Sequence, residues 1–453
     1  GSFSESVGVG TTLLLNEYSD LSISGITSNI NDLVYYKDSI YVVGNSGYFA
    51  KYDLKTKQWS SLSINANKYT NLNSININKD GLCIIVGDNG TIIYSSKKTD
   101  DNYPKTFVYK VEKDITEDLS EVVINKDNKN IYIVGKGIKI VYTTRVSSIT
   151  YDNFGVKTHN TIKVPTSNYF NIFQNINTIN NVVEYCCLNL NNSIGIGSYY
   201  IDYLDKNLDK NLGNYKNPLD LSQFSIIKPN TKSIYIHNNI NHNIIVHHNN
   251  SSNKIEIGIL DISNKATIKN VNTYNIKNDE KIDAYYVNNT NVGLITDKLN
   301  YYQCNDNVKT MMSLKLNDTK NISNSKIVQI TPLRNNYTEI YHFGSGGRIL
   351  NYNINNKHTT DLKLESGTTA LQIQIVPNLN GIDEKGNNVY IVNGNEKNYK
   401  INTTTFTDWK DKTIRLEGNN NSLLIDNTNN HNEDNIKLLR FNYSVNKHEV
   451  DNT

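Results

Sequence analysis

Short runs of apolar residues alternate with polar breaks along the first hundred residues. Apolar residues occupy most of 33–36 and 40–44, and after the Asn45-Ser46-Gly47 break they return at 48–54 and 59–64. Each run is about five residues long and is bounded by Asn, Asp, Ser, Lys or Gly, as short β-strands are. The pattern predicts a unit of four antiparallel strands joined as a meander.

The same unit recurs along the chain. Its second strand, turn and third strand reappear, in whole or in part, at 82–94, 131–142, 193–197, 243–246, 292–302, 340–352 and 389–401. One anchor residue in each copy, at 44, 87, 135, 195, 246, 293, 344 and 394, gives a period of about 50 residues. No segment has the apolar period of 3.6 residues that a helix shows. The sequence therefore predicts an all-β chain of eight repeated units.

A four-stranded unit cannot bury both of its faces alone, so each copy needs a neighbour on either side. Units of this length close into a β-propeller, which leaves only short sheet edges. We expect a single β-propeller of four-stranded antiparallel blades over residues 3–453, with eight blades favoured over seven or nine, and residues 1–2 left by cloning. The N-terminal strand (11–18) and the C-terminal strands (422–443) are expected to share the closing blade.

One copy of the unit resembles a known repeat. The sequence Val86-Gly-Asp-Asn-Gly-Thr-Ile-Ile-Tyr-Ser95 is similar to the repeat of phage tail-fibre and photosystem-assembly-factor propellers. The first unit, with Tyr52, Asp53 and Trp59, looks like a kelch blade, although the kelch Gly-Gly pair is absent. The resemblance implies a propeller and, through the tail-fibre group, an adhesin for a host surface. It assigns no functional residue.

Composition and net charge limit the classes of partner that the chain is expected to bind. Asn makes up roughly one residue in six, and 46 Lys and Arg against 44 Asp and Glu leave a formal net charge of +2. Because there is no basic field for phosphate groups, no nucleic-acid partner is expected. The bias toward Asn, Ile, Lys and Tyr is typical of an AT-rich viral or bacterial genome, and Asn also favours turns.

Cysteine spacing and hydropathy predict neither a disulfide framework nor a membrane span. Cys83, Cys186, Cys187 and Cys304 form no C-x-x-C pair, so we expect buried structural thiols. No apolar run approaches the ~18 residues that cross a bilayer, so no membrane insertion is expected.

Catalytic and metal-binding signals are sparse. The Asp boxes of sialidase-like propellers are absent, and the five Arg residues are scattered. The cluster of His237, His242, His247 and His248 spreads over both faces of an extended chain, which favours a solvated strand end and turn. Residues 426–434 lack the glycine and the closing Glu of a calcium loop. We expect no enzyme, cofactor or metal, although the two acids of a glycosidase need only converge in space.

The turns between second and third strands predict a ligand-binding face. In a meander these turns leave the same end of each blade as the links between blades, where variation costs the core nothing. Their side chains differ from copy to copy, whereas turns serving geometry alone tend to repeat Asn-Gly or Asp-Gly. The predicted face comprises Asn45, Asp88, Asn89, His247, His248, Asn249, Arg348 and Asn395, with Ser46, Lys136, Asn250 and Glu396 in the same turns and Tyr69, Tyr169 and Phe170 as candidate loop aromatics.

Together these observations favour a non-enzymatic binding module. We expect a receptor-binding or adhesion propeller of a viral, phage or bacterial surface protein, part of a larger polypeptide or assembly, that recognises a cell-surface glycan or protein. Its expected location is extracellular or on a virion surface. One alternative is an intracellular, cytoplasmic kelch-like scaffold for protein–protein interactions, and a second is a glycan-cleaving enzyme.

Overall fold

The description rests on a computed structural model of the chain. It describes residues 15–62, 70–95, 104, 106–110, 112–125, 130–143, 158–176, 183–192, 197–204, 217–226, 231–239, 241–249, 251–263, 265–276, 279–288, 291–298, 300–304, 311–315, 326–330, 337–355, 360–364, 371–376, 389–394, 397–402, 413–417, 422–426, 439–443 and 446–449. The chain forms two compact units, which are described separately. Unit 1 comprises residues 1–22, 280–342 and 349–453, and unit 2 comprises 23–279 and 343–348.

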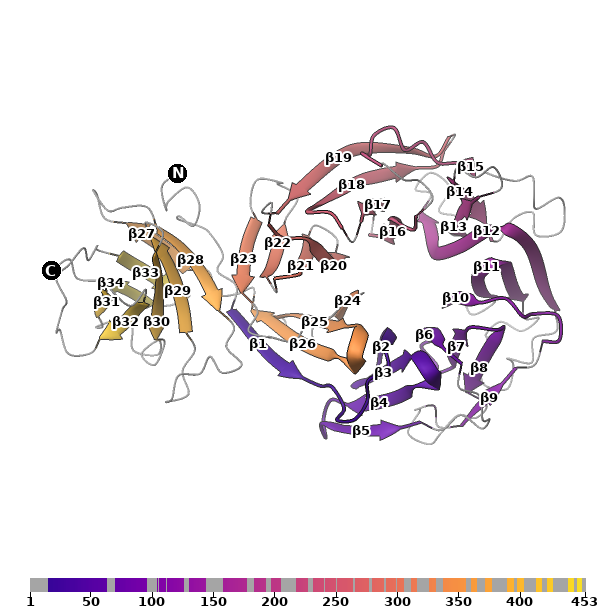
Figure 1. Ribbon diagram of the computed structural model, residues 1–453, viewed down its shortest axis with the longest axis horizontal. Coiled ribbons are helices and arrows are strands. Elements are labelled where there is room, and N and C mark those ends of the chain that lie inside the picture. The colour runs from indigo at the N-terminus through magenta and orange to yellow at the C-terminus, as the bar shows by residue number, and fades with distance from the viewer. Residues whose placement is uncertain are drawn as a thin grey trace. The chain divides into compact units, whose positions relative to one another are not determined.

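The first two sheets of unit 2 are the predicted four-stranded meanders (Figure 1). The first contains β2 (Ile30–Tyr36), β3 (Ser39–Gly44), β4 (Phe49–Asp53) and β5 (Gln58–Ser61). The second contains β6 (Leu72–Ile77), β7 (Cys83–Gly87), β8 (Thr91–Ser95) and β9 (Phe107–Tyr109). Every neighbouring pair of strands in them is antiparallel. The apolar runs and turns of the sequence therefore predicted these two blades correctly.

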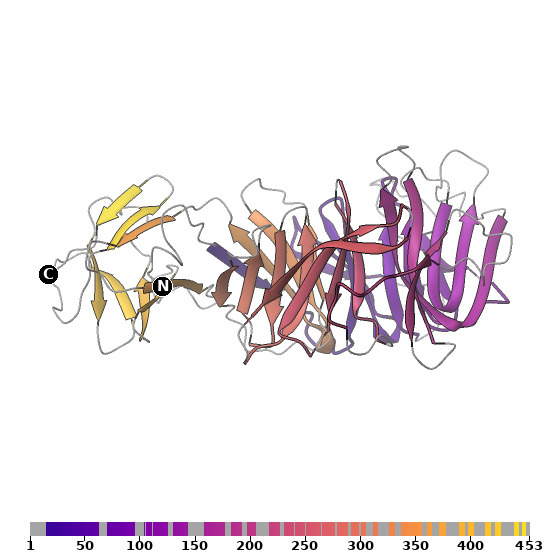
Figure 2. The same ribbon diagram turned by 90° about the horizontal axis from the view of Figure 1, so that it is seen from above.

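The third sheet of unit 2 has six strands rather than the expected four. Its strands are β10 (Leu119–Ile124), β11 (Asn130–Thr143), β12 (Thr158–Ile176), β13 (Val183–Asn191), β14 (Ser198–Tyr203) and β15 (Asn217–Pro218). The first part of β12 pairs with β11 and the later part pairs with β13. Because β12 pairs with a different strand along each part of its length, the sheet extends past four strands, and Figure 2 shows these strands from the side.

A fourth sheet completes unit 2, and two more blade sheets lie in unit 1. The fourth sheet contains β16 (Ile234–Asn238), β17 (Asn243–His248), β18 (Lys254–Asp261) and β19 (Thr267–Asn275). In unit 1, β20 (Ile282–Asn288), β21 (Asn291–Thr296), β22 (Asn300–Cys304) and β23 (Met311–Lys315) form one meander. The other sheet contains β24 (Lys326–Ile330), β25 (Tyr337–Phe343), β26 (Ile349–Asn355) and β1 (Leu15–Asp20).

That last blade contains the expected N-terminal strand but not the expected C-terminal ones. The N-terminal strand β1 pairs antiparallel with β26, with Tyr18 opposite Tyr352. Segments 422–426 and 439–443 instead form β32 (Ser422–Asp426), paired with β31 (Thr413–Glu417), and β33 (Leu439–Tyr443), paired with β27 (Thr360–Leu364) and β34 (Asn446–Glu449). The blade therefore gains its fourth strand from the N-terminus without the C-terminal strands.

The protein is an all-β propeller built of four-stranded antiparallel blades. Over the described part of the chain it has six blades rather than the expected eight. The anchor at 195 lies outside those residues. The anchor at 394 ends β29 (Val389–Gly394), which lies between β28 (Leu371–Val376) and β30 (Lys397–Asn402). In the described residues, the helical turns are η1 (Asn45–Gly47) and η3 (Ser345–Gly347). None of the described helices is long and apolar enough to span a membrane.

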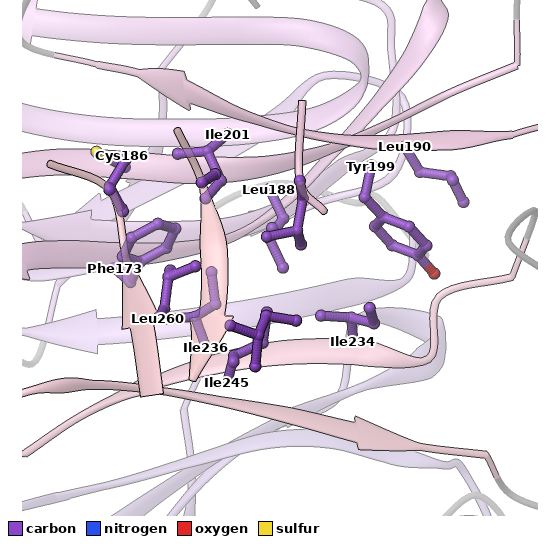
Figure 3. Close-up of a cluster of buried hydrophobic side chains, with 14 of the residues drawn as sticks. Phe173, Cys186, Leu188, Leu190, Tyr199, Ile201, Ile234, Ile236, Ile245 and Leu260 are labelled. Carbon is purple, nitrogen blue, oxygen red and sulfur yellow. The ribbon is translucent and has the colours of Figure 1, made fainter. Parts of the chain in front are cut away.

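The hydrophobic core of unit 2 lies between neighbouring blades. In one cluster, Leu188 and Ile201 of the β10–β15 sheet lie in the same buried layer as Ile234, Ile236 and Ile245 of the β16–β19 sheet (Figure 3). Burying a side chain of this size contributes about 1.5–3 kcal/mol, so these contacts hold the sheets face to face. The side chains of Cys83, Cys186 and Cys187 are buried, as the sequence predicted.

Polar side chains on the first strands connect successive blades of unit 2. The register shifts between Ile30 and Asp32 in β2, and equivalent shifts precede Ser74 in β6 and Glu121 in β10. The side chain that follows each shift accepts a hydrogen bond from a backbone N–H, which belongs to the first strand of the next blade for Asp32 and Ser74 and to β12 of the same sheet for Glu121. The three contacts are Ile75 N to Asp32 Oδ2 (2.9 Å), Val122 N to Ser74 Oγ (3.2 Å) and Ile172 N to Glu121 Oε2 (2.7 Å). Because β6 and β10 are edge strands, the bonds to Ile75 and Val122 satisfy main-chain donors that have no neighbouring strand to pair with.

Candidate functional site

The turns of the first blades of unit 2 lie at the same end as the segments that enter the next blade. Ser46 N donates to Asn71 Oδ1 (3.1 Å), Asn89 N to Asp118 Oδ1 (3.0 Å) and Gly90 N to the Glu117 carbonyl (2.7 Å). Lys136 N donates to the Asp118 carbonyl (2.9 Å). We define the turn face as the turns 45–47, 88–90 and 136–137 with the entering segments 70–71 and 112–118. Within unit 2, these contacts place the turns and the links between blades at the same end of the sheets, as the sequence predicted.

The glycine of the repeated Val-Gly sequence has a steric role beneath this face. A Cβ atom on Gly44 or Gly87 would lie 2.2 Å from the carbonyl oxygen of Asn29 or Asn71, and on Gly135 it would lie 2.1 Å from that of Asp118. Each carbonyl belongs to the residue just before a first strand. Only glycine allows the second strand to approach that segment so closely, which explains why the sequence repeats it.

Two asparagines attach the turn side chains to the framework. Asn31 Nδ2 donates to Asn45 Oδ1 (2.8 Å) and to the Leu72 carbonyl (2.8 Å) of the next blade. Asn73 Nδ2 makes the equivalent bonds, to Asp88 Oδ1 (2.9 Å) and to the Leu119 carbonyl (2.7 Å). An amide nitrogen suits this branch point because it carries two donors. Asn45 and Asp88, which were predicted to contact a ligand, are therefore bound into the junctions between blades.

The exposed side chains of the turn face are Ser46, Asn89 and Lys136 at the turn tips and Lys113, Asp114 and Thr116 in the entering segment. Charges of both signs pair here. Lys136 Nζ lies 3.5 Å from Asp118 Oδ2, and Lys163 Nζ lies 3.1 Å from Glu117 Oε1. Partial burial acts to raise the pKa of Glu117, but the Lys163 ammonium and hydrogen bonds outweigh it and lower the pKa. The face is polar and mixed in charge, so it has no single-sign field to select a charged ligand.

The predicted histidines are in the core rather than in an exposed turn. His247 and His248 end strand β17 and are 8% and 6% exposed. His247 Nδ1 lies 2.9 Å from Glu256 Oε1, and Glu256 also accepts bonds from Ser225 N (3.0 Å) and Ser225 Oγ (2.7 Å). The prediction placed these residues in the turn because it ended the strand at Val246. Through Glu256, His247 is connected to Ser225 in the segment that precedes the β16–β19 blade. Asn249, which follows the two histidines, is exposed.

The remaining predicted residues separate into three groups. Arg348 follows η3 and is half-buried, with its backbone N donating to the Ser345 carbonyl (3.5 Å). Tyr169 and Phe170 were predicted as loop aromatics, but they lie within β12 and are 1% and 4% exposed. Tyr69, Asn250, Asn395, Glu396 and the loop 427–434 lie outside the described residues.

Sequence reasoning missed a buried charged pair between β11 and β14. Lys139 Nζ lies 3.1 Å from Asp202 Oδ2, and their side chains are 2% and 1% exposed. The Lys139 ammonium also lies 5.0 Å from the centre of the Tyr169 ring. Its signal in the sequence was a lysine inside the apolar run 138–142 and an aspartate between Ile201 and Tyr203. Charged residues at such positions are rarely buried unless paired.

Comparison with known proteins supports the class that this geometry defines, a β-propeller. No protein-family model matches the sequence, and no curated protein matches it. Among solved structures, YCF48 bound to a D1 peptide matches with a TM-score of 0.51 and 12% identity, over 74% of this chain and 94% of that one. Of the resemblances expected from the sequence, the similarity to the propeller fold of a photosystem assembly factor is thus confirmed. Similarity to tail fibres or kelch proteins is not shown.

Two further solved structures match at lower scores. YCF48 from Cyanidioschyzon merolae has a TM-score of 0.46 at 12% identity, over 74% of this chain and 98% of that one. The Cps50 (Swd1) β-propeller domain of Myceliophteria thermophila has a TM-score of 0.48 at 9% identity, over the same shares.

Proposed function

We propose that this chain is a non-enzymatic scaffold that binds a protein or peptide partner on the turn face of unit 2. The observation that carries the proposal is the attachment of that face to the framework. The turns of two successive blades are each bonded to the segment entering the next blade, so their tips are held in a fixed geometry. A preorganised surface loses little conformational entropy when a partner binds.

Two further observations support a protein partner over a glycan, the two partners that the sequence left open. The solved structure with a TM-score of 0.51 is a propeller with a peptide bound, although at 12% identity it speaks only for the fold. Two of the three candidate loop aromatics, Tyr169 and Phe170, are buried in β12 and offer no ring face on which a sugar could stack. The exposed side chains of the turn face are amides, hydroxyls and paired charges, which can hydrogen-bond to a peptide main chain.

A selection with a matched pair of variants tests this proposal. The full chain is immobilised and used to select peptides from a phage-displayed random library, and the affinity of the selected peptides is measured for each variant. The turn-face variant is Thr116→Arg with Lys136→Glu. The control variant, Thr56→Arg with Lys79→Glu, makes the same chemical changes in exposed turns at the other end of the first two blades.

We expect the turn-face variant to weaken binding at least tenfold, about 1.4 kcal/mol, and the control variant to bind like the original chain. Both variants should melt at the temperature of the original chain, because all four positions are exposed. Loss of binding in the control variant alone would place the site at the opposite end. A library that yields no binding peptide would remove the basis for a peptide-binding scaffold.

A further inference from the structure

The pair of Lys139 and Asp202 lies in a buried and largely apolar layer of unit 2. It contacts Tyr169 and Cys187, which belong to the cluster Tyr132, Val134, Val141, Tyr169, Ile172, Tyr185, Cys187 and Leu204. Lys139 and Asp202 are each 1% exposed as whole residues, and Nζ and Oδ2 are 3.1 Å apart. Water is therefore excluded from a contact between an amine and a carboxyl group.

The strand registers show what lies beside this contact. Tyr169 of β12 is opposite Asn189 of β13, and Cys187 of β13 is opposite Asp202 of β14. Because Lys139 Nζ approaches both Tyr169 and Asp202, it lies over β13 at the level of Cys187 and Asn189. Asn189 is fully buried, and neither Oδ1 nor Nδ2 of its side chain has a hydrogen-bond partner. An amide donor and acceptor are thus available next to the pair.

Keeping two full charges in this layer is unfavourable. Desolvation of a buried ion pair can exceed the attraction between its members, whereas an amide carries no net charge. A proton that passes from Nζ to Oδ2 leaves a neutral amine in contact with a neutral carboxylic acid. Joining the two removes both charges from the core and releases one water molecule from a site where water is scarce.

We propose that Lys139 and Asp202 are a modification site at which an amide bond forms between Nζ of the lysine and Cγ of the aspartate. The amine lone pair attacks Cγ, the Cγ–OH bond breaks, and the hydroxyl leaves as water with a proton from the nitrogen. No oxidant, reductant or cofactor takes part. The product links β11 to β14 covalently, between residues that are 63 positions apart in the chain.

Intact-mass spectrometry of the purified full chain, denatured and reduced, tests the proposal directly. We expect a mass one water, about 18 Da, below that of the sequence. In a tryptic digest, cleavage after Lys139 should be blocked, and residues 137–145 should appear joined to residues 164–206. The linked chain should also migrate faster on a denaturing gel than the Lys139→Arg variant, because the loop between the two residues remains closed.

The exposed pair of Lys269 and Asp261 is an internal control in the same digest. Its Nζ–Oδ2 distance is shorter, 2.7 Å, but its side chains are 61% and 31% exposed, so solvation should keep it ionic and unlinked. A chain at full sequence mass would overturn the proposal, whatever the variants do. A mass lower by about 17 Da, with Lys139 joined to the peptide through Asn189, would also overturn it, because ammonia rather than water would have left.

Discussion

The hydrogen bond between Asn73 and Asp88 allows a test of whether the turn side chains stabilise the fold or contact a ligand. Asn73→Ala removes two hydrogen bonds, one to the Asp88 carboxylate (2.9 Å) and one to the Leu119 carbonyl (2.7 Å). A bond to a charged group contributes about 1.5–3 kcal/mol and a neutral one about 0.5–1.5 kcal/mol. We therefore expect the variant to lower the free energy of unfolding by about 2–4 kcal/mol.

Asp88→Ala should be destabilising for the same reason. Its carboxylate accepts bonds from Asn71 Nδ2 (3.2 Å) as well as from Asn73. The double variant Asn73→Ala with Asp88→Ala loses their shared bond only once. We expect the sum of the two single losses in free energy of unfolding to exceed the loss in the double variant by about 1–2 kcal/mol, the coupling energy of groups in contact.

Urea denaturation measures these energies. In a Trp409→Phe background, Trp59 in β5, whose ring centre lies 5.0 Å from that of Tyr52, gives a fluorescence signal from unit 2. Circular dichroism follows all the strands. The exposed Asn241→Ala variant serves as the control and should change stability by less than 0.5 kcal/mol. If Asp88→Ala unfolds at the original urea concentration and the two mutations are additive, the turn side chains do not hold the blades together, and our reasoning about the junction is wrong.

Two further predictions concern the core. Burial lowers the pKa of His342 from 6.5 to about 3, so the unfolded chain takes up a proton that the folded chain does not. Its contribution to stability is therefore constant above pH 6.5 and falls as the pH decreases toward 3, by about 2 kcal/mol at pH 5. His342→Phe should remove that loss between pH 7.5 and 5 in urea titrations, and an unchanged pH profile would contradict the buried neutral ring. Gly87→Ala places a Cβ 2.2 Å from the Asn71 carbonyl oxygen. We therefore expect the free energy of unfolding, measured by the same assay, to fall by about 1–3 kcal/mol. A stability equal to that of the original chain would show that the entering segment can move.

Local pattern determined the strands. The runs at 40–44, 82–87 and 131–135 became β3, β7 and the first part of β11 because five apolar residues between turn-forming residues have few alternatives to a buried strand. The all-β class follows from runs of about five residues, and the repeated unit follows from their recurrence at a period of about 50 residues.

Contacts between distant residues decided the rest. Turn sequences alone do not specify which strands become neighbours. The neighbouring strands decide whether the Asp88 side chain faces a ligand or bonds to Asn73, and whether His247 is exposed or lies beside Glu256. The same holds for β1, which pairs with β26 rather than with a C-terminal strand. Lys139 and Asp202 lie 63 positions apart, and each is an ordinary charged residue until two strands bring them into one dry layer. Burial and pairing are properties of the assembled blades, because the dielectric environment of a side chain is set by whatever packs against it.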